Sequence, residues 1–420
     1  MEKTLKKSKK YFLVGNHRTV NPKKTYAVVT EAIKRAQLPI WDNIERIDSF
    51  DILGLPVFAV IHQDIFHNSK TPNWGKGPTE ILAQVSGMME RVERYSASDV
   101  NKKILKFDRF NNLKKRAISR WDLVPCNLQR SLYTKAELDD KKIYWENCFS
   151  LTTGDEVFIP ANLVYFLPVP ELKDFSYTAG LAAGNSIEEA IIYALCELIE
   201  HHLEELYYRN KIKSSTIDLK SIENQEIKKM VESYVSNDME LCLSYTNLNF
   251  GIPVVRAFAF PKNGPYLNSY GFYAAMGVHP DKDVAITRAL TELAQFRSAA
   301  IYAKENGMEK ISLSEKKPQH IFDFFSSIID SKKKIHYNQI KNYALDDMKD
   351  EIEMLTNILE NKGCEVIFKD LTHPILKIPV VRVIILGLQP GIFGSGIIDL
   401  DHPAARISEQ LNCYNDYVKD

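Results

Sequence analysis

The sequence predicts a mixed fold, α/β or α+β, assembled from internally repeated strand–helix sub-structures. Proline directly precedes a β-branched, apolar run in GLPVFAV (54–60), GIPVVRAFAF (251–260) and KIPVVRVIIL (377–386). Proline is tolerated at the first residue of a strand, so these runs predict three similar strands. Apolar residues recur at three- and four-residue steps in 79–97, 186–206 and 283–302, which predicts three long helices. Strands mixed with long helices indicate this fold class.

Composition is typical of a globular protein that stays in a reducing compartment. Lys plus Arg and Asp plus Glu both number 54 among 420 residues, so the formal net charge is zero. Proteins that bind nucleic acid usually carry a basic excess, and we therefore expect no such partner. The six cysteines include no CxxC pair, which argues against a zinc ribbon or a dithiol redox motif. We expect a cytoplasmic protein.

Neither end of the sequence predicts a membrane segment. MEKTLKKSKKYF (1–12) is basic but leads into no long apolar core, so we interpret it as a solvated tail. The most apolar stretch, 378–393, is interrupted by Arg382 and Pro390 and is too short to span a bilayer.

Two further segments have a recognisable character. Residues 18–38 predict a turn and then a helix, with Pro22 near the helix start. Residues 303–350 are rich in Lys, Glu and Ser, and we interpret them as exposed connections around a short helix. A variable insertion is expected here.

The three long helices share a polar stripe with spacing i, i+4, i+7, which places its members on one face. The stripes are Ser86, Glu90, Glu93; Tyr193, Glu197, Glu200; and Arg288, Glu292, Gln295. Glu189 extends the second stripe by one turn. A solvated face is the ordinary explanation for such a stripe. The second stripe, however, is bordered by apolar residues over most of the helix, which predicts an interior or cleft position.

Several carboxylates in one partly dry site would raise one another's pKa, and a divalent cation removes that cost. Oxygen ligands favour Mg²⁺ over zinc or copper. Mg²⁺ seldom occupies an all-protein cage and prefers to share phosphate oxygens. An acidic site for Mg²⁺ therefore predicts a nucleoside triphosphate.

The loops before two of these helices fit phosphate binding without a P-loop. TAGLAAGNSIEE (178–189) is glycine-rich, and Asn185 with Glu188 resembles a capping box at a helix start. Free N–H groups at such a start favour anions. GKG (75–77) also precedes a helix, but it lacks the Walker A spacing. We expect its Lys76 to contact the nucleotide.

These segments, taken together, resemble the YcaO family. The similar stretches are HRTVNPKKT (17–25), GKGPTEILAQVSGMMERVERYSA (75–97), GLAAGNSIEEAIIYALCELIEHH (180–202), GVHPDKDVAITRALTELAQFR (277–297) and DLTHPILKIPVVRVIILGLQP (370–390). They follow one another in the family's order, from His17 to Pro390. The resemblance implies a YcaO-type fold with a central ATP cleft. Residues 1–70 are expected to contribute to the nucleotide site, and residues 71–420 to form the YcaO domain.

The resemblance also implies ATP and Mg²⁺ as cofactors and transfer of the γ-phosphate to the oxygen of a peptide amide. The expected ATP contacts are Arg18, Thr25, Lys76, Ser86, Glu90, Asn185, Glu189, Arg288, Glu292 and Gln295. The expected metal ligands are Glu90, Glu93, Glu189, Glu197 and Glu200. No residue is assigned to the chemical step itself.

The sequence departs from the family pattern at several points. His201 stands where an arginine often follows the second glutamate pair, which puts a phosphate contact in doubt. Leu386 replaces a common proline, and the third helix has ExxQ in place of ExxxQ. The end, ARISEQLNCYNDYVKD (405–420), lacks the PxPxP tail of the azoline-forming members. We also expect no peptide-recognition domain before residue 17.

The missing tail, the missing peptide-recognition domain and a resemblance to the stand-alone archaeal YcaO proteins favour thioamidation. The expected substrate is a glycine of methyl-coenzyme M reductase. In this hypothesis external sulfide, delivered by a TfuA-type partner, attacks the activated amide. One alternative is a cyclodehydratase that makes azolines from Cys, Ser or Thr of a ribosomal peptide. Another is a non-catalytic, nucleotide-binding regulatory module. A di-iron carboxylate oxidase is disfavoured because His201 follows Glu197 by four residues, where that class needs ExxH.

The expected partners follow from the first hypothesis. They are a peptide or protein substrate, the TfuA-type protein and a second copy of the chain as a homodimer. Nucleic acid and membranes are not expected.

Overall fold

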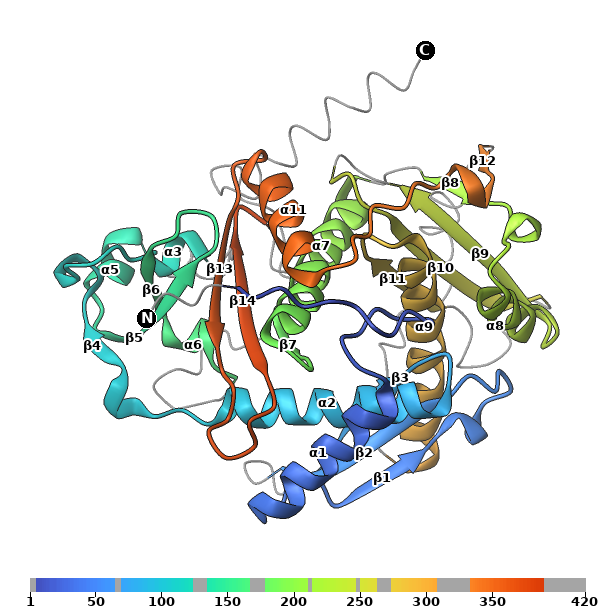
Figure 1. Ribbon diagram of the computed structural model, residues 1–420, viewed down its shortest axis with the longest axis horizontal. Coiled ribbons are helices and arrows are strands. Elements are labelled where there is room, and N and C mark those ends of the chain that lie inside the picture. Colours follow the sequence, from blue (N-terminus) through green and yellow to red (C-terminus); the bar gives the residue numbers. More distant parts are fainter. Residues whose placement is uncertain are drawn as a thin grey trace. The chain divides into compact units, whose positions relative to one another are not determined.

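The computed structural model describes residues 5–64, 69–123, 134–166, 178–210, 214–246, 250–262, 273–307 and 333–388 (Figure 1). Chain contacts divide the protein into two compact, discontinuous units. The first unit comprises Met1–Lys9, Val92–Asn210 and Leu345–Asp420, and the second comprises Lys10–Arg91 and Lys211–Ala344. Both units mix strands and helices, so the predicted fold class is confirmed.

The first unit contains a six-stranded antiparallel sheet in the order β4-β5-β13-β14-β7, with β6 paired to β5. Its strands are β4 (Lys106–Asp108), β5 (Ile143–Ser150), β6 (Glu156–Pro160), β7 (Leu181–Ala183), β13 (Glu365–Asp370) and β14 (Val380–Leu386). Strand β14 begins directly after Pro379, as the sequence predicts. Its residues are buried along nearly the whole strand, which identifies it as a core strand.

Helices cover this sheet. Helix α7 (Ile187–Asn210) packs on β14 and β7, and α11 (Met348–Glu360) packs on α7 and β13 (Figure 1). The short helices of the unit are α3 (Arg120–Leu123), α5 (Lys135–Asp140) and α6 (Ala161–Val164), with 3-10 turns η2 (Lys102–Ile104) and η3 (Phe110–Asn112).

The second unit contains two sheets. The first has the antiparallel order β1-β2-β3, and the second has the order β11-β10-β9-β8-β12, in which β12 runs parallel to β8. Their strands are β1 (Asn43–Arg46), β2 (Val57–Asp64), β3 (Ser69–Lys76), β8 (Ser215–Ile217), β9 (Met239–Thr246), β10 (Val254–Pro261), β11 (Tyr273–Val278) and β12 (Lys334–Ile335). Strands β2 and β10 begin after Pro56 and Pro253, so all three predicted strand starts are confirmed.

Helix α9 (Lys282–Glu305) joins the two sheets of this unit, because it packs on β10 and β11 and also on β2 and β3 (Figure 1). The remaining helices are α1 (Pro22–Ala36) and α8 (Gln225–Val235), with 3-10 turns η1 (Asp48–Phe50), η5 (Leu219–Ser221) and η7 (Tyr337–Gln339). Pro22 is the first residue of α1 and Asn21 caps it, as predicted for residues 18–38.

Helix α2 (Glu80–Ser98) contributes its residues up to Arg91 to the second unit and those from Val92 to the first. With α7 and α9 it completes the three predicted long helices. We expected residues 1–70 to contribute to the nucleotide site and residues 71–420 to form the YcaO domain. This division stays a prediction.

The strand before each long helix carries a small residue, and in all three copies it is separated from the central glutamate of the helix by the same number of residues. Gly75, Ala182 and Gly277 precede Glu90, Glu197 and Glu292 by fifteen residues each (90 − 75, 197 − 182, 292 − 277). A Cβ added at Gly75 would lie 2.1 Å from the carbonyl oxygen of Ala83, eight residues later.

The same close approach recurs in the third copy. A Cβ added at Gly277 would lie 2.1 Å from the carbonyl oxygen of Ala285, again eight residues later. Ala190 stands at this position on α7 and is fully buried. The strand and the helix therefore approach closely in the first and third copies, and a small buried residue stands at the same place in the second. This supports the predicted repeat of strand–helix sub-structures.

The N-terminal segment is not a solvated tail, so that expectation is wrong for the described residues. Within the first unit, the Lys6 N–H donates to Glu188 Oε1 (2.8 Å), and the Ser8 N–H donates to Asp347 Oδ2 (2.8 Å). The Ser8 carbonyl accepts from the Met348 N–H at 2.9 Å. These contacts place residues 6–8 against the starts of α7 and α11.

Part of the expected exposed connection is also buried. Tyr337 and Ile340 belong to the core of the second unit, with 5 % and 2 % of their surface exposed. Residues 308–332 lie outside the described residues, so the expected variable insertion remains a prediction there.

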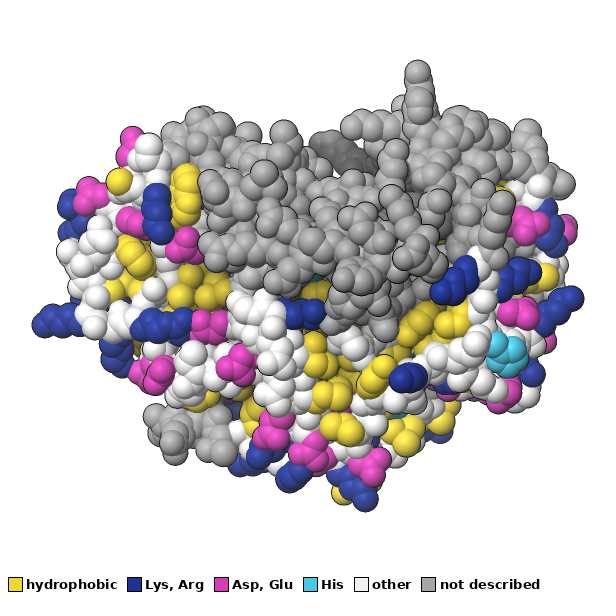
Figure 2. Space-filling model, turned by 90° about the horizontal axis from the view of Figure 1, so that it is seen from above, with side chains coloured by type: hydrophobic (Ala, Val, Ile, Leu, Met, Phe, Trp, Pro, Cys, Tyr) yellow, Lys and Arg dark blue, Asp and Glu magenta, His cyan; other side chains and the backbone are white. Residues whose placement is uncertain are grey.

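On the face shown in Figure 2, basic and acidic side chains of the described residues are interspersed, in keeping with a net charge of zero. None of the helices in the described ranges combines the length and hydrophobicity that a membrane crossing requires.

Candidate nucleotide and metal site

In the second unit, two of the predicted glutamates contact residues of strand β3. The backbone N–H of Trp74 donates to Glu90 Oε2 (3.0 Å), and Lys76 Nζ lies 2.5 Å from Glu292 Oε1. Glu90 and Glu292 occupy equivalent positions of the strand–helix repeat. Lys76 and Glu292 are 18 % and 17 % exposed, so their ion pair is largely shielded from water. The structure thus brings together Lys76 and Glu292, which the sequence assigned independently to the nucleotide.

The predicted basic residues Arg18 and Arg288 lie near a common point, the buried ring of His279. Burial holds the pKa of His279 well below its ordinary value, and the neighbouring basic groups of His17, Lys10, Arg288 and Arg18 lower that pKa further. The Arg18 backbone pairs with Phe12, which closes a short N-terminal hairpin. This part of the second unit therefore concentrates positive charge, as a triphosphate would require.

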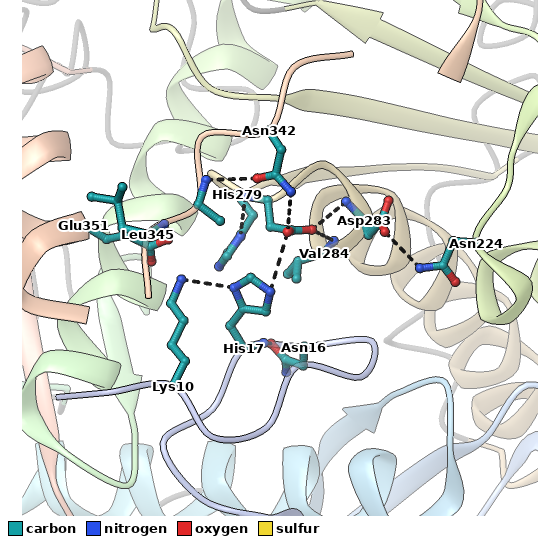
Figure 3. A network of polar contacts seen from close by, with 12 residues as sticks. Lys10, Asn16, His17, Asn224, His279, Asp283, Val284, Asn342, Leu345 and Glu351 are labelled. Carbon is teal, nitrogen blue, oxygen red and sulfur yellow. Dashed lines mark hydrogen bonds and ion pairs between the residues drawn. The ribbon is translucent and has the colours of Figure 1, made fainter. Parts of the chain in front are cut away.

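A buried polar network surrounds this point (Figure 3). Lys10 Nζ donates to His17 Nδ1 (3.1 Å), and His17 Nε2 lies 3.6 Å from Asp281 Oδ2. The rings of His17 and His279 meet edge to face, with centroids 5.2 Å apart. Burial, and then the Lys10 charge, lower the pKa of His17 to about 4, while Asp281 acts in the opposite direction. His17 is therefore neutral at pH 7.

Asp281 is the N-cap of α9, the helix that carries Arg288 and Glu292. Its Oδ1 accepts from the backbone N–H groups of Asp283 (2.8 Å) and Val284 (3.1 Å). Its Oδ2 accepts from Asn342 Nδ2 (2.7 Å), and its own N–H donates to His279 Nδ1 (2.9 Å). The start of α9 is thus fixed from several directions.

Three other predicted contacts of the nucleotide have less specific surroundings. Thr25 lies on the buried face of α1, with 4 % of its surface exposed. Ser86 on α2 and Gln295 on α9 are half-buried. Their assignment to the nucleotide stays a prediction.

In the first unit, Asn185 and Glu189 form one of the predicted groupings. Asn185 Nδ2 donates to Glu189 Oε1 (2.9 Å), and Glu189 is fully buried. The capping interpretation was wrong in one respect. The N-cap is Ser186, whose Oγ accepts from the Glu189 N–H (3.1 Å), and Asn185 precedes it. The Asn185 side chain therefore donates to a carboxylate of the first helical turn.

Three further acids of α7, Glu197, Glu200 and Glu204, lie near His201. Glu197 Oε1 lies 3.7 Å from His201 Nε2, and Glu204 Oε2 lies 3.8 Å from His201 Nδ1. Burial disfavours the charged ring, but the hydrogen bond to Glu197 and the charges of Glu197, Glu204 and Glu200 outweigh it and raise the pKa of His201 to about 9. His201 is thus a cation at neutral pH.

Glu200 is only 6 % exposed, which confirms that the second stripe faces the interior. Glu93 is half-buried in the part of α2 that belongs to the first unit. Among the described residues, no group of three or more His, Cys, Asp or Glu side chains is arranged to hold a metal ion by itself. The assignment of the five predicted metal ligands stays a prediction.

The sequence analysis missed Lys10, His279, Asp281 and Asn342 as members of the second unit's polar network. His279 and Asp281 stand within GVHPDKD, at the start of the third repeat. The aligned position in the second repeat is Ser186, a cap, so the repeat itself marks Asp281 as a helix start. Nothing in the local sequence relates residue 10 or 342 to this helix.

The family model described as YcaO cyclodehydratase, ATP- and Mg²⁺-binding, matches residues 74–389. The chain belongs to the YcaO family. ATP and Mg²⁺ are the cofactors of this family, and its members are ATP-dependent enzymes that activate peptide amides.

Two relatives match most of this YcaO chain. An uncharacterized protein of Methanothermobacter thermautotrophicus is 29 % identical over 359 residues, covering 83 % of this chain and 89 % of the relative. A Rhizobium leguminosarum bv. trifolii protein, named for its place in the tfuA 3′ region, is 26 % identical over 391 residues and covers 90 % of both chains.

Two solved structures share the fold. A heterocyclase in complex with substrate and cofactor has a TM-score of 0.77 at 21 % identity, covering 93 % of this chain. This chain spans 55 % of the heterocyclase chain. YcaO from Methanopyrus kandleri, bound with AMPPCP and Mg²⁺, has a TM-score of 0.72 at 22 % identity and covers 92 % of this chain and 96 % of its own. At these identities the matches establish the fold.

The donor set of this chain fits the family's cofactors. Buried Glu189 and Glu200, with half-buried Glu197, offer only oxygen ligands, which suit Mg²⁺.

Proposed function

We propose that this YcaO protein converts a peptide amide to a thioamide, with ATP, Mg²⁺ and sulfide as co-reactants. One match supports sulfide as the nucleophile. It covers 90 % of both chains, and the matched protein is named for the tfuA 3′ region. It agrees with the TfuA-type partner expected from the sequence. The proposed substrate is a glycine amide, with that of methyl-coenzyme M reductase as the first candidate.

The reaction balances without any redox partner. Hydrosulfide adds to the amide carbon, and the amide oxygen then attacks the γ-phosphorus of ATP. The carbon–oxygen bond breaks as phosphate leaves, so amide, hydrosulfide and ATP give thioamide, ADP and hydrogen phosphate. Phosphate is a far better leaving group than oxide or hydroxide, which is why ATP is needed.

The residues of the chain would act by positioning and by charge. We assign Arg18, Arg288 and Lys76 to the triphosphate. The charges of Arg18 and Arg288 both lower the pKa of buried His279, and Lys76 pairs with Glu292, another predicted contact of the nucleotide. Glu90, Glu93, Glu189, Glu197 and Glu200 are the proposed magnesium ligands. Bound Mg²⁺ would neutralise charge that develops on the transferred phosphoryl group.

Sulfur is proposed to come from outside the chain. Cys196, on the stripe-bearing helix α7, has no exposed surface and lies among core residues. A buried thiol of this kind is unsuited to receive and pass on sulfur.

The second candidate is an azoline-forming cyclodehydratase, which is favoured by the structural match to a heterocyclase. In that reaction a Cys, Ser or Thr side chain of the peptide replaces hydrosulfide as nucleophile. The tail that bears on this choice, 405–420, lies outside the described residues. A regulatory module without catalysis is the third candidate.

Mass spectrometry separates these candidates. The protein is incubated with ATP, Mg²⁺, sulfide, a TfuA-type protein and a glycine peptide copied from methyl-coenzyme M reductase. Thioamidation predicts a mass gain equal to exchange of one oxygen for sulfur, with one phosphate released per exchange. Loss of one water from a Cys- or Ser-containing peptide would instead support the azoline reaction. Phosphate release at background level with every peptide would support the regulatory module.

A further inference from the structure

The buried network around His17 ties the N-terminal hairpin to the start of α9. His17 directly precedes Arg18, and α9 carries Arg288 two turns after its cap. The ring of His17, the residue before Arg18, has its centroid 5.2 Å from that of His279. A Cβ added at Gly277, two residues before His279, would lie 2.9 Å from the Cβ of Arg288, so both arginines branch from backbone near His279. Contacts that fix the N-terminal hairpin to α9 would therefore also fix the position of Arg18 relative to Arg288.

Hydrogen-bond directions in the network are determined by its chemistry. The Lys10 ammonium has donors only, so it donates to His17 Nδ1. The proton of the neutral ring is then on Nε2, which faces the Asp281 carboxylate at 3.6 Å. Lys10, His17 and Asp281 are each at least 91 % buried, because none has more than 9 % of its surface exposed. A buried polar network that is well satisfied makes the structure around it more rigid.

We infer that His17 and Asp281 are positioning residues, which hold Arg18 and Arg288 in a common orientation for the triphosphate. They act through the two arginines and touch no reacting atom. The inference rests on the proposed assignment of these arginines to ATP. The network does more than cap a helix, since the cap itself uses only Asp281 Oδ1.

The strand–helix repeat supplies the variant that separates capping from positioning. Ser186 caps α7 at the position that Asp281 occupies on α9. Serine caps a helix about as well as aspartate. Asp281→Ser therefore keeps the cap of α9, but its shorter side chain no longer reaches His17 or Asn342.

The experiment measures AMPPCP binding in the presence of Mg²⁺ by calorimetry, together with thermal stability and ATP kinetics. Asp281→Ser and His17→Gln should each weaken AMPPCP binding about 10-fold and raise KM for ATP by a similar factor, with kcat changed by less than about threefold. The double variant should be no weaker than either single one, because both break the same link. Asp281→Asn, which retains the length and polarity of the side chain, should recover part of the affinity.

Asp347→Ser is the matched control, because Asp347 caps α11 in the same way and α11 carries no predicted contact of the nucleotide. It should leave AMPPCP binding unchanged. Wild-type affinity in Asp281→Ser, an equal loss in Asp347→Ser, or additive effects of the two network variants would each overturn the inference. AMPPCP binding is independent of the product formed, so absence of a thioamide would count against the proposed function alone.

Discussion

Lys76 Nζ lies 2.5 Å from Glu292 Oε1, and the pair joins the end of β3 to the middle of α9. Both side chains are mostly buried, so their interaction is less screened than that of a surface pair. Two residues that the sequence assigned to one ligand are thus neighbours in the structure.

A double-mutant cycle should measure this ion pair. With Lys76→Met and Glu292→Gln, we expect a coupling of about 1–2 kcal/mol in the free energy of unfolding, measured in urea. The exposed pair Lys229–Glu226 on α8, with Nζ 2.9 Å from Oε1, is the control and should give less than about 0.5 kcal/mol. Equal coupling in the two pairs would contradict the shielding argument. Saturating AMPPCP and Mg²⁺ should reduce the first coupling if Lys76 turns to the phosphates.

Glu197→Gln should weaken binding of Mg²⁺–AMPPCP by at least about 10-fold while the protein stays folded, because it removes one of few charged oxygen ligands. Calorimetry at several Mg²⁺ concentrations checks this. Glu204→Gln is the control, since Glu204 lies as close to His201 as Glu197 does but is not a predicted ligand. If Glu197→Gln unfolds the chain, or if Glu204→Gln weakens binding equally, the acidic stripe of α7 is structural.

Stability should fall in acid through His202. This side chain is fully buried, and burial, with a smaller effect of Lys362, lowers its pKa to about 3. The unfolded chain, with an ordinary pKa of about 6.5, takes up the proton first. The contribution of His202 is thus complete above pH 6.5 and is lost as the pH falls toward 3, by up to about 1.4 kcal/mol per pH unit.

Urea denaturation at pH 7.5 and 5.5 measures this slope. His202→Gln should show a smaller loss between the two pH values than the wild type. Identical slopes would mean that the ring is protonated in the folded state.

Gly277→Ala should destabilise the second unit by about 2–3 kcal/mol, because the added Cβ would meet the backbone carbonyl of Ala285 and the strand cannot move away freely. Gly54→Ala is the control. Its φ of +64° strains an alanine, but no atom lies within 4 Å of the new Cβ, so the cost should be about 1 kcal/mol. A Gly277→Ala protein as stable as the control would show that the close contact between β11 and α9 relaxes easily.

The elements that the sequence predicted best are those with a strong local signal. Pro56, Pro253 and Pro379 marked three strand starts correctly, since a proline restricts the backbone wherever it stands. The apolar periodicity of α2, α7 and α9 located these helices within a few residues. Burial of the α7 acids was likewise visible in the apolar residues beside them.

The errors concern contacts between distant segments. No pattern in residues 1–12 reveals that Ser8 pairs with Asp347, because each side of that contact is an ordinary polar stretch. The buried contact between His17 and Asp281 was missed for the same reason. The cap at Ser186 was misplaced by one residue, since Asn and Ser are both good caps and only the structure shows which oxygen reaches the Glu189 N–H.

The small strand residue and the central glutamate are separated by fifteen residues in all three copies. The length of this segment is therefore constrained, independently of its sequence. One extra residue between Gly277 and Glu292 would turn the carboxylate about 100° around the α9 axis, away from Lys76. The side chains between the strand residue and the glutamate can differ, as they do between the three copies. Insertions and deletions in this segment would not be tolerated. Comparison of gap positions, more than of residue identities, should therefore reveal which distant sequences keep a working site.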